Sequence, residues 1–281
     1  MVAYCDVILD TTTESVRSGE SAVANLFSDI LRRHGEVDIA LLHGGFFRSN
    51  SVHPTGLLSL AALQDMMPFD DFAVTLELTG AQIQAALENG VSRVSAYDGR
   101  FLHPSGLTYF FNPDDKVGHR VSNIQVSRTT EGDELPSFEP ILYDSVYTCI
   151  VPSFIADGGD GFNFLKSVSR RVPPGSCRKV KHIILEHLQQ RIKPVGSSAE
   201  LTMSDFESID NKLEERIVRV HSSHTFDEAS IGDDGSVQTS TAICQEEECE
   251  QSMAGEASAD PDIIDAEKAL PEQSGSPGGD Q

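Results

Sequence analysis

The sequence contains 281 residues, and its 44 acidic side chains outnumber the 21 Lys and Arg, giving a formal net charge of −23 at pH 7. Because phosphate backbones attract clustered basic side chains, this balance argues against sequence-independent binding of DNA or RNA. No run approaches the roughly 18 apolar residues of a membrane-spanning helix, and residues 1–6 have neither the basic start nor the apolar core of a signal peptide.

The acidic residues are concentrated in the C-terminal part of the chain. Residues 1–196 hold 17 basic and 23 acidic side chains, whereas residues 197–281 hold 4 and 21. The second part is rich in Ser, Glu, Asp, Gln and Gly. Such a composition buries too little apolar surface to offset an ordering cost of about 1–2 kcal/mol per residue. We therefore expect one folded domain over residues 1–194 and an acidic, mostly disordered tail over residues 195–281.

One segment of this tail is expected to be ordered. Between Ser204 and Val220, apolar residues recur at helical spacing behind a Ser204/Glu207 pair that is typical of a capping box. The pattern predicts a single amphipathic helix over residues 204–220. Such a helix would give the tail a surface for binding a protein partner.

The five cysteines leave the cellular compartment open. They are widely spaced and odd in number, which argues against a complete disulfide framework. Cys244 and Cys249 lie close together among glutamates. They are compatible with solvated free thiols and, as the less favoured alternative, with a zinc site.

The first predicted elements are a helix and a buried strand. Residues 18–34 place apolar side chains on one side, and Gly35 is suited to end this helix. Residues 37–42 then form an apolar-rich strand that runs directly into a Gly-Gly pair. The loop leading to Arg48 is therefore attached to a strand end, which is the usual position for functional groups in mixed α/β architectures.

Helices and strands alternate irregularly over the rest of the domain. Further helices are expected over residues 59–66, 79–90 and 176–192. Further strands are expected over residues 72–78, 106–111, 121–126 and 146–151. Because strict β-α-β regularity is absent, the sequence predicts a single α/β domain in which helices pack on mixed sheets.

Four short segments carry the groups that a nucleotide pocket needs, at residues 16–20, 43–48, 67–70 and 154–162. Together they offer two arginines for phosphate or carboxylate oxygens and two aromatic rings for a flat base. They also offer an aspartate, flanked by glycines, that can accept hydrogen bonds from hydroxyls. This combination suits a nucleotide.

The sequence shows no cluster of metal ligands beside these segments. The nine histidines are scattered, and the pairs His43/His53 and His221/His224 lack carboxylates at ligand spacing. We therefore expect no metal site and no catalytic residue in this chain, which is better equipped to bind than to cut.

Several motifs occur in an order that resembles the C-terminal, substrate-binding domain of the 5′-nucleotidase and UDP-sugar hydrolase family. They include Arg17-x-x-Glu20, the Gly-Gly-x-x-Arg that ends at Arg48, Pro68-Phe69, Leu78-Thr79-Gly80 and Gly158-Gly159-Asp160-Gly161-Phe162. The resemblance covers roughly residues 4–190. It implies a two-domain metallophosphoesterase of nucleotide catabolism, whose N-terminal domain carries two divalent metal ions and hydrolyses phosphoesters. We expect that domain to be missing from this chain, which alone should be inactive.

The resemblance implies seven substrate-binding residues, namely Arg17, His43, Gly45, Arg48, Phe69, Phe154 and Asp160. Phe69 and Phe154 match the two rings that sandwich the base. Arg17 and Arg48 match arginines that hold phosphate or another acidic group, and Asp160 matches the aspartate that accepts from ribose hydroxyls. The ligand would be a nucleotide or nucleoside, AMP-like or UDP-sugar-like.

The same side chains also have plainer interpretations. The two phenylalanines could be core residues, Arg17 could form a surface ion pair with Glu20, and Asp160 could belong to a mere Gly-rich turn. The ligand hypothesis requires that Phe69 and Phe154 face each other across a gap that accepts a base.

The sequence departs from the family pattern at two places. His43 and Phe46 stand where the family commonly has the first Asn and a Gly of Asn-Gly-Gly-Gly, so base contacts are expected to differ and Phe46 to add bulk beside the ligand. Asp70 and Asp71 follow Phe69 in place of Gly-Asn or Gly-Gly. Their charge is unfavourable near an anionic ligand unless a metal or an arginine offsets it.

Three interpretations of the whole chain stay open at this point. It is the nucleoside-binding part of a nucleotidase, a non-catalytic nucleotide-binding or partner-binding module with an acidic tail, or a purely structural domain. The sequence also leaves open whether it is a truncated gene model or a free-standing domain. Its location is unknown, although relatives are often secreted or surface-anchored.

Overall fold

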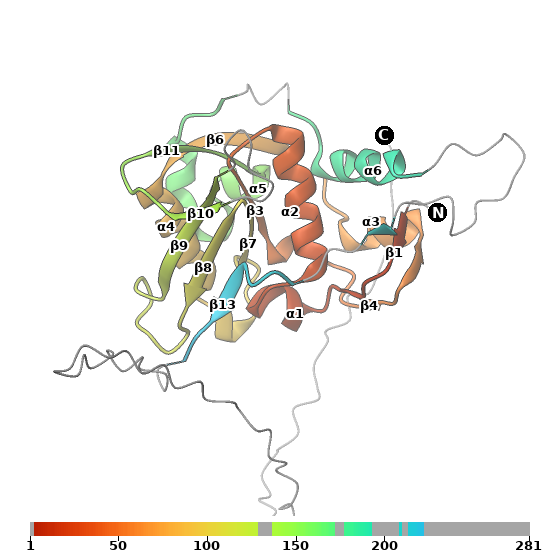
Figure 1. Cartoon of the computed structure of the whole chain (residues 1–281), viewed down its shortest axis with the longest axis horizontal. Helices are drawn as coiled ribbons and strands as arrows, with labels where there is room; N and C mark the ends of the chain where they lie inside the picture. The colour runs from red at the N-terminus through yellow and green to blue at the C-terminus, as the bar shows by residue number, and fades with distance from the viewer. Residues whose placement is uncertain (1–2, 129–136, 172–176, 193–207, 210–212, 222–281) are drawn as a thin grey trace, which may run out of the picture. The chain divides into compact units, whose positions relative to one another are not determined.

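A four-stranded mixed sheet lies at the centre of the fold (Figure 1). Its strands run in the order β6 (Ala73–Thr79), β11 (Val146–Pro152), β3 (Ile39–His43) and β7 (Leu102–Ser105). Strand β11 is parallel to β3 and antiparallel to β6, and β3 is antiparallel to β7. All five residues of β3 are buried, because helices cover both faces of the sheet.

The computed structural model describes residues 3–128, 137–171, 177–192, 208–209 and 213–221. The helices in this part of the chain are α1 (Thr13–Ser18), α2 (Ala22–Gly35), α3 (Leu60–Met66), α4 (Gly80–Val91), α5 (Ser153–Ala156) and α6 (Val180–Gln190). Short 3-10 turns cover Gly44–Phe46, Val94–Ala96, Gly159–Gly161 and Asn163–Ser167. Among the described helices, none has both the length and the apolarity needed to cross a bilayer.

Other sheets flank the central one. The largest of them is also four-stranded and has the order β10 (Ser137–Pro140), β9 (Val121–Arg128), β8 (Leu107–Phe111) and β13 (Ile217–Arg219). Near the N-terminus, β1 (Ala3–Cys5) lies between β12 (Ser208–Ile209) and β5 (Gly56–Leu58), and β2 (Leu9–Asp10) pairs with β4 (Val52–His53).

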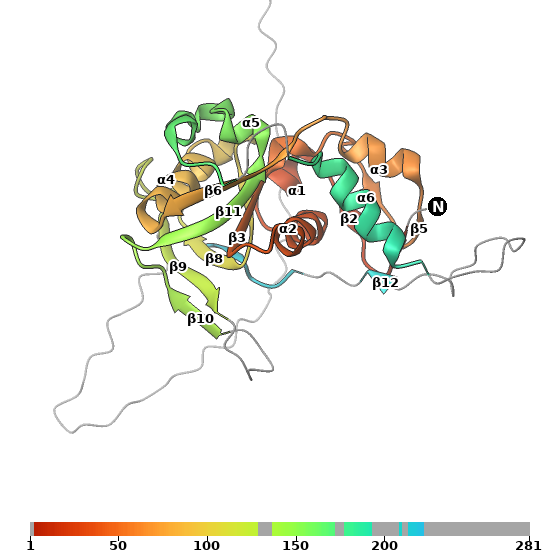
Figure 2. The same ribbon diagram turned by 90° about the horizontal axis from the view of Figure 1, so that it is seen from above.

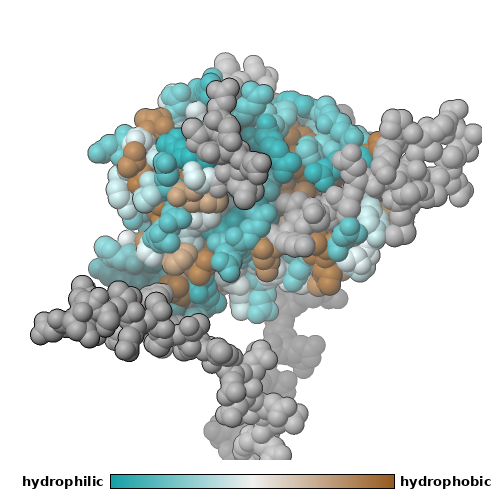
Figure 3. Space-filling view, viewed as in Figure 1, coloured by the Kyte–Doolittle hydropathy of each residue, from teal (hydrophilic) through white to brown (hydrophobic). Residues whose placement is uncertain are grey.

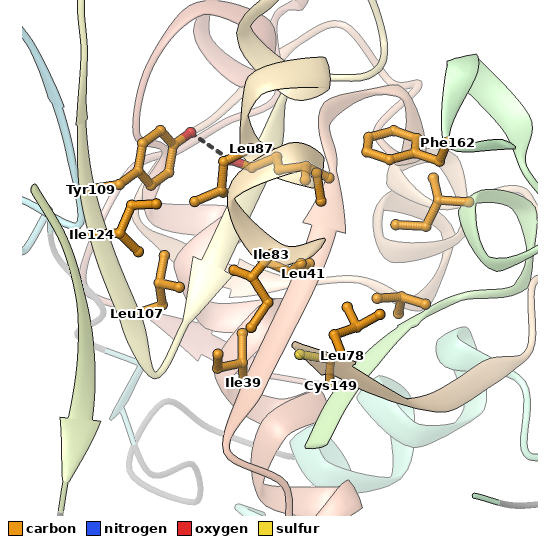
Figure 4. Close-up of a cluster of buried hydrophobic side chains, with 14 of the residues drawn as sticks. Ile39, Leu41, Leu78, Ile83, Leu87, Leu107, Tyr109, Ile124, Cys149 and Phe162 are labelled. Atoms are coloured by element: carbon orange, nitrogen blue, oxygen red, sulfur yellow. Dashed lines mark hydrogen bonds between the residues drawn. The ribbon is translucent and has the colours of Figure 1, made fainter. Parts of the chain in front are cut away.

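The central sheet separates two hydrophobic clusters. Figure 2 shows α2 and α4 on opposite sides of this sheet. Along β3, Ala40 and Leu42 belong to the cluster on the α2 side, whereas Ile39 and Leu41 belong to the cluster with α4. Figure 4 shows the second cluster, in which Ile83 of α4 lies close to these two β3 side chains. The alternation is the period-2 pattern of a strand buried on both faces.

Outside these clusters, large apolar side chains are more scattered. On the face shown in Figure 3, hydrophobic residues form small groups between hydrophilic ones. Single exposed apolar side chains of this kind are normal for a folded domain.

The expected mixed α/β fold is confirmed, and most predicted elements lie within a few residues of their expected positions. The first helix is the main difference. Residues expected as one helix from 18 to 34 are divided between the end of α1 and α2. Thr12 begins α1 by accepting from the backbone N–H of Ser15, so Arg17 lies in the last turn of a separate short helix.

The prediction of an amphipathic helix over residues 204–220 is wrong where the structure describes this segment. Ile217–Arg219 forms strand β13, paired parallel to β8, and Ser208–Ile209 forms strand β12. The reason is a set of long-range contacts that local periodicity cannot show, since tertiary context overrides propensity. Of the tail expected to be mostly disordered over residues 195–281, residues 195–207, 210–212 and 222–281 lie outside the described residues.

Arg216 anchors this C-terminal segment. Its guanidinium binds both carboxylate oxygens of Asp29 on α2, at 2.7 and 2.8 Å, and the side chain is buried. Glu20 accepts from the backbone N–H groups of Glu214 and Arg216 at 2.8 and 3.1 Å. Burial raises the pKa of Asp29, but the hydrogen bonds and charge of Arg216 outweigh this and hold the pKa below its ordinary value.

Replacing Arg216 by Ala should therefore destabilise the domain, because it leaves the half-buried Asp29 without its bidentate partner. We expect the free energy of unfolding in guanidinium chloride to fall by about 3 kcal/mol. Arg219→Ala, at the exposed end of the strand β13 that follows Arg216, should change this free energy by less than about 0.5 kcal/mol. Equal effects of the two substitutions would show that Arg216 does not anchor the segment.

Candidate functional site

A cavity of about 670 Å³ opens where segments far apart in the sequence meet. This volume is within the range of small-molecule sites. Its wall contains all seven of the residues predicted from the sequence, namely Arg17, His43, Gly45, Arg48, Phe69, Phe154 and Asp160. The wall also contains Asp70, Asp71, Ala96, Tyr97, Asp98 and Gly99.

Strand pairing explains why these segments meet. Because β3 and β11 are parallel, their C-terminal ends reach the same edge of the sheet, bringing His43 close to Phe154. Strand β6 runs the opposite way, so its N-terminal end lies at that edge and carries the loop with Phe69. Crevices outside the carboxyl ends of strands are the usual ligand sites of open α/β sheets.

The two predicted ring residues are half-exposed. Phe69 is 38% exposed and Phe154 is 43% exposed, whereas the nearby Phe46 and Phe47 are fully buried. The interpretation of Phe69 and Phe154 as core residues is therefore wrong. The guanidinium carbon of Arg48 lies 5.0 Å from the centre of the Phe69 ring, a distance at which a cation is attracted to the face of a ring.

Phe154 is supported from two sides. Its ring stacks on His43, with 5.4 Å between the ring centres and 24° between the planes. The ring also rests against Gly159, where an added Cβ would lie 2.5 Å from the nearest ring atom. Gly159 itself is not part of the cavity wall.

His43 is a neutral imidazole in the cavity wall. Burial, followed by the positive charge of Arg48, lowers its pKa to about 3. Its Nδ1 is buried and has no hydrogen-bond partner among the described residues. The neutral ring offers one donor and one acceptor to a ligand. The expectation that Phe46 adds bulk beside a ligand is wrong, because Phe46 is fully buried and contacts the edge of the His43 ring.

Two glycines bring the loop after β3 against its neighbours. The backbone N–H of Gly45 donates to the carbonyl of Gly99 at 2.8 Å, and that of Gly44 donates to the carbonyl of Phe101 at 2.7 Å. A Cβ on Gly44 would lie 2.1 Å from the carbonyl oxygen of Val16. The loop can therefore approach α1 only with glycine at this position.

Arg17 and Arg48 form a positive corner of the cavity. Burial, followed by the charge of Arg48, lowers the pKa of Arg17. Arg17 donates to the carbonyl of Tyr97 at 3.1 Å, and Arg48 donates to the carbonyl of Gly45 at 3.0 Å. The alternative ion pair between Arg17 and Glu20 is wrong, because the Glu20 carboxylate binds Asn25 and the C-terminal segment instead.

Asp160 lies opposite these arginines in a strained turn. Its φ of 48° is in the left-handed region, which is unfavourable for a residue with a side chain, and Asn89 donates to its carbonyl at 3.1 Å. Burial, followed by the charge of Asp98, raises the pKa of its carboxyl group. The turn is therefore held by α4, and Asp160 forms part of the cavity wall.

The 96–99 loop was missed by the sequence interpretation. Tyr97 has a φ of 49° and is 41% exposed, and Asp98 is bound by Arg100 and Arg93. The only signal in the sequence was an Asp98-Gly99 turn pattern, which does not show which other loop the turn meets.

Taken together, the wall can stack a flat ring, attract an anion and accept from hydroxyls. Metal chemistry is not assigned to it. Among the described residues, no group of three or more His, Cys, Asp or Glu side chains is placed to hold a metal ion.

Comparison with known proteins shows which sequences and structures this chain is similar to. The family model described as the 5′-nucleotidase C-terminal domain matches residues 2–167. The chain is 33% identical over 200 residues to the trifunctional nucleotide phosphoesterase YfkN of Bacillus subtilis, covering 70% of this chain and 13% of that protein. It is 30% identical over 214 residues to a 5′-nucleotidase of Diplobatis ommata, covering 69% and 37%.

A solved structure is similar as well. The 5′-nucleotidase precursor from Thermus thermophilus superposes with a TM-score of 0.65 at 31% sequence identity. The match covers 78% of this chain and 39% of that one. The chain thus spans well under half the length of each of these three proteins.

The buried state of His43 predicts a pH-dependent stability. The unfolded chain binds a proton near the ordinary pKa of 6.5, whereas folded His43 binds one only near pH 3, so the free energy of unfolding falls as the pH drops through this window. Between pH 7 and pH 5 the contribution of His43 is about 2 kcal/mol. Between pH 7 and pH 5, the free energy of unfolding of His43→Asn should therefore fall by about 2 kcal/mol less than that of the wild type.

Chemical unfolding at pH 7, 6 and 5 measures this difference. His119→Asn removes an exposed histidine and serves as the control, which should follow the wild type. His103, whose pKa burial lowers to about 4, adds acid sensitivity equally to all three proteins. Parallel curves for His43→Asn and wild type would contradict the prediction.

Proposed function

This chain belongs to the 5′-nucleotidase family, whose C-terminal domain it matches, and we propose that its cavity binds a nucleotide or nucleoside. The observation that carries the proposal is the convergence of all seven residues on one wall, with two half-exposed rings beside two arginines. Relatives are named as nucleotide phosphoesterases and 5′-nucleotidases. The ligand class proposed is AMP-like or UDP-sugar-like.

In this proposal each end of the cavity binds a different part of the ligand. Phe69 and Phe154 hold the base between them, and each stacked base face contributes about 1–3 kcal/mol. The neutral ring of His43 lies beside the base. Arg17 and Arg48 hold the phosphate, for which the planar five-donor guanidinium is well suited. Asp160 accepts from the ribose hydroxyls.

We further propose that phosphoester hydrolysis requires a second domain. Two divalent metal ions would be held there, and bound metals lower the pKa of water and neutralise phosphate charge. In this chain the residues around the cavity would bind and orient the nucleotide, excluding water from the base. A non-catalytic binding module is the alternative, and it shares the same ligand contacts.

Removing either aromatic ring should weaken nucleotide binding without unfolding the protein. We expect Phe69→Ala and Phe154→Ala each to raise the Kd for AMP by about 5- to 150-fold in isothermal titration calorimetry, the equivalent of one lost stacking face. Phe138→Ala is the matched control, because Phe138 is 45% exposed on β10 and is not part of the cavity wall. If wild type and all three variants bound AMP with equal affinity, the proposal that Phe69 and Phe154 hold the base between them would be rejected.

A separate experiment tests whether hydrolysis requires a second domain. The 281-residue chain should release no phosphate from AMP above the buffer rate in the presence of Mg²⁺ or Mn²⁺, under conditions in which calorimetry shows AMP to be bound. A phosphate-release assay measures this. Metal-dependent hydrolysis at enzyme-like rates would contradict the need for a second domain.

A further inference from the structure

An acidic pair in the cavity wall calls for explanation. Asp70 and Asp71 follow Phe69 directly and both line the cavity that the proposed function assigns to an anionic ligand. Two carboxylates near a phosphate are unfavourable by simple electrostatics. Their partners in the structure show that the two residues act differently.

Asp70 is neutralised by two lysines at the start of α6. Lys179 lies 2.9 Å from one carboxylate oxygen, and Lys181 pairs with the other. Hydrogen bonds from Lys181 and then Lys179 lower the pKa of Asp70 to about 2. We expected a metal or an arginine to offset the charge of Asp70, but two lysines do so. Their ion pairs with Asp70 also tie the Phe69 loop to α6.

Asp71 instead bonds to the segment that carries the second ring. Its Oδ1 accepts from the hydroxyl of Ser153 at 3.0 Å and from the backbone N–H of Phe154 at 3.1 Å. The Ser153 hydroxyl accepts in turn from the backbone N–H of Phe72 at 3.0 Å, and the Ser153 N–H donates to the Phe72 carbonyl at 2.7 Å. A closed set of hydrogen bonds therefore joins the two loops.

Because of its position in the chain, Asp71 links the segment of Phe69 to the segment of Phe154. It lies two residues after Phe69, and it binds the N–H of Phe154 itself. The backbone carbonyl of Asp71 also accepts from the N–H of Val180 at 2.8 Å, so the residue is held from a third side. A shift of either loop would have to break at least one of these bonds.

We propose that Asp71 is a positioning residue that fixes the gap between Phe69 and Phe154 and so sets the stacking of the base. The inference rests on the proposed function, since it concerns the same ring pair. Stacking is sensitive to this gap, because a void of about 0.5–1 Å forfeits a quarter to a half of the contact energy. Asp71 would thus act through the two rings without touching the ligand.

Positioning and charge make opposite predictions for this residue. If Asp71 only adds negative charge to the wall, its removal tightens binding of an anion. If Asp71 positions the rings, its removal weakens binding of any ligand that stacks between them. Adenosine, which has no phosphate, isolates the second effect.

The experiment titrates the full chain and its variants with AMP and with adenosine by isothermal titration calorimetry. We expect Asp71→Ala to raise the Kd of both ligands about tenfold. Asp71→Asn keeps an oxygen that can accept from the Phe154 N–H, and should recover to within about threefold of wild type. Asp70→Ala removes the same charge from the same wall but frees two lysines, so it should favour AMP over adenosine, whereas Asp71→Ala weakens both ligands.

A second variant guards against a folding defect in Asp71→Ala. Ser153→Ala removes the hydroxyl that bridges the two loops while leaving the acidic pair intact, and should weaken adenosine in the same direction. Thermal unfolding of each variant identifies those that are folded. Unchanged adenosine affinity in a folded Asp71→Ala or Ser153→Ala protein overturns the positioning role.

Failure of the wider proposal looks different. If wild type binds neither AMP nor adenosine nor UMP, the proposed function is rejected and the positioning role with it. If wild type binds them and Asp71→Ala behaves like Asp70→Ala, the cavity is a nucleotide site in which Asp71 contributes only charge.

Discussion

The position of strand β11 between β3 and β6 is the constraint on which the cavity depends. Its antiparallel register with β6 runs without interruption from Val146 opposite Thr79 to Pro152 opposite Ala73, and its parallel register with β3 pairs Cys149 with Ile39. A shift by one residue would move every side chain of β11 to the opposite face of the sheet. Because this register is fixed by burial on both faces, the loops at one edge of the sheet are fixed as well, and the candidate ligand contacts meet there.

Electrostatics within the site depends on how the acidic side chains are paired. The chain carries a net charge of −23, yet two arginines face the cavity. Asp98 is bound by Arg100 and Arg93, and Asp70 by two lysines. None of the ion pairs among the described residues involves Arg17 or Arg48. Local pairing of the neighbouring acidic side chains therefore leaves two arginines without a salt bridge in the cavity wall of an acidic protein.

Structure that depends on local sequence signals could be predicted from the sequence. Structure that is determined by contacts between distant residues could not. A buried strand followed by glycines located the His43 loop, and a Gly-rich turn located Asp160. The same reasoning assigned a helix to residues 204–220, because apolar spacing does not show that Arg216 binds Asp29, 187 residues away. It also could not show that Phe46 points into the core, nor that the carboxylate of Asp71 binds the Phe154 segment.

The imidazole of His43 lies close to both the aromatic and the cationic groups of the cavity wall. Its buried Nδ1 has no hydrogen-bond partner among the described residues, which costs about 1–3 kcal/mol. Protonation of the ring is unfavourable as well, because burial and then the positive charge of Arg48 lower its pKa. The ring is therefore held neutral and stacked on Phe154. Arg48 lies beside both the Phe69 ring and the neutral His43 ring, so aromatic, neutral polar and cationic groups meet in one cavity wall.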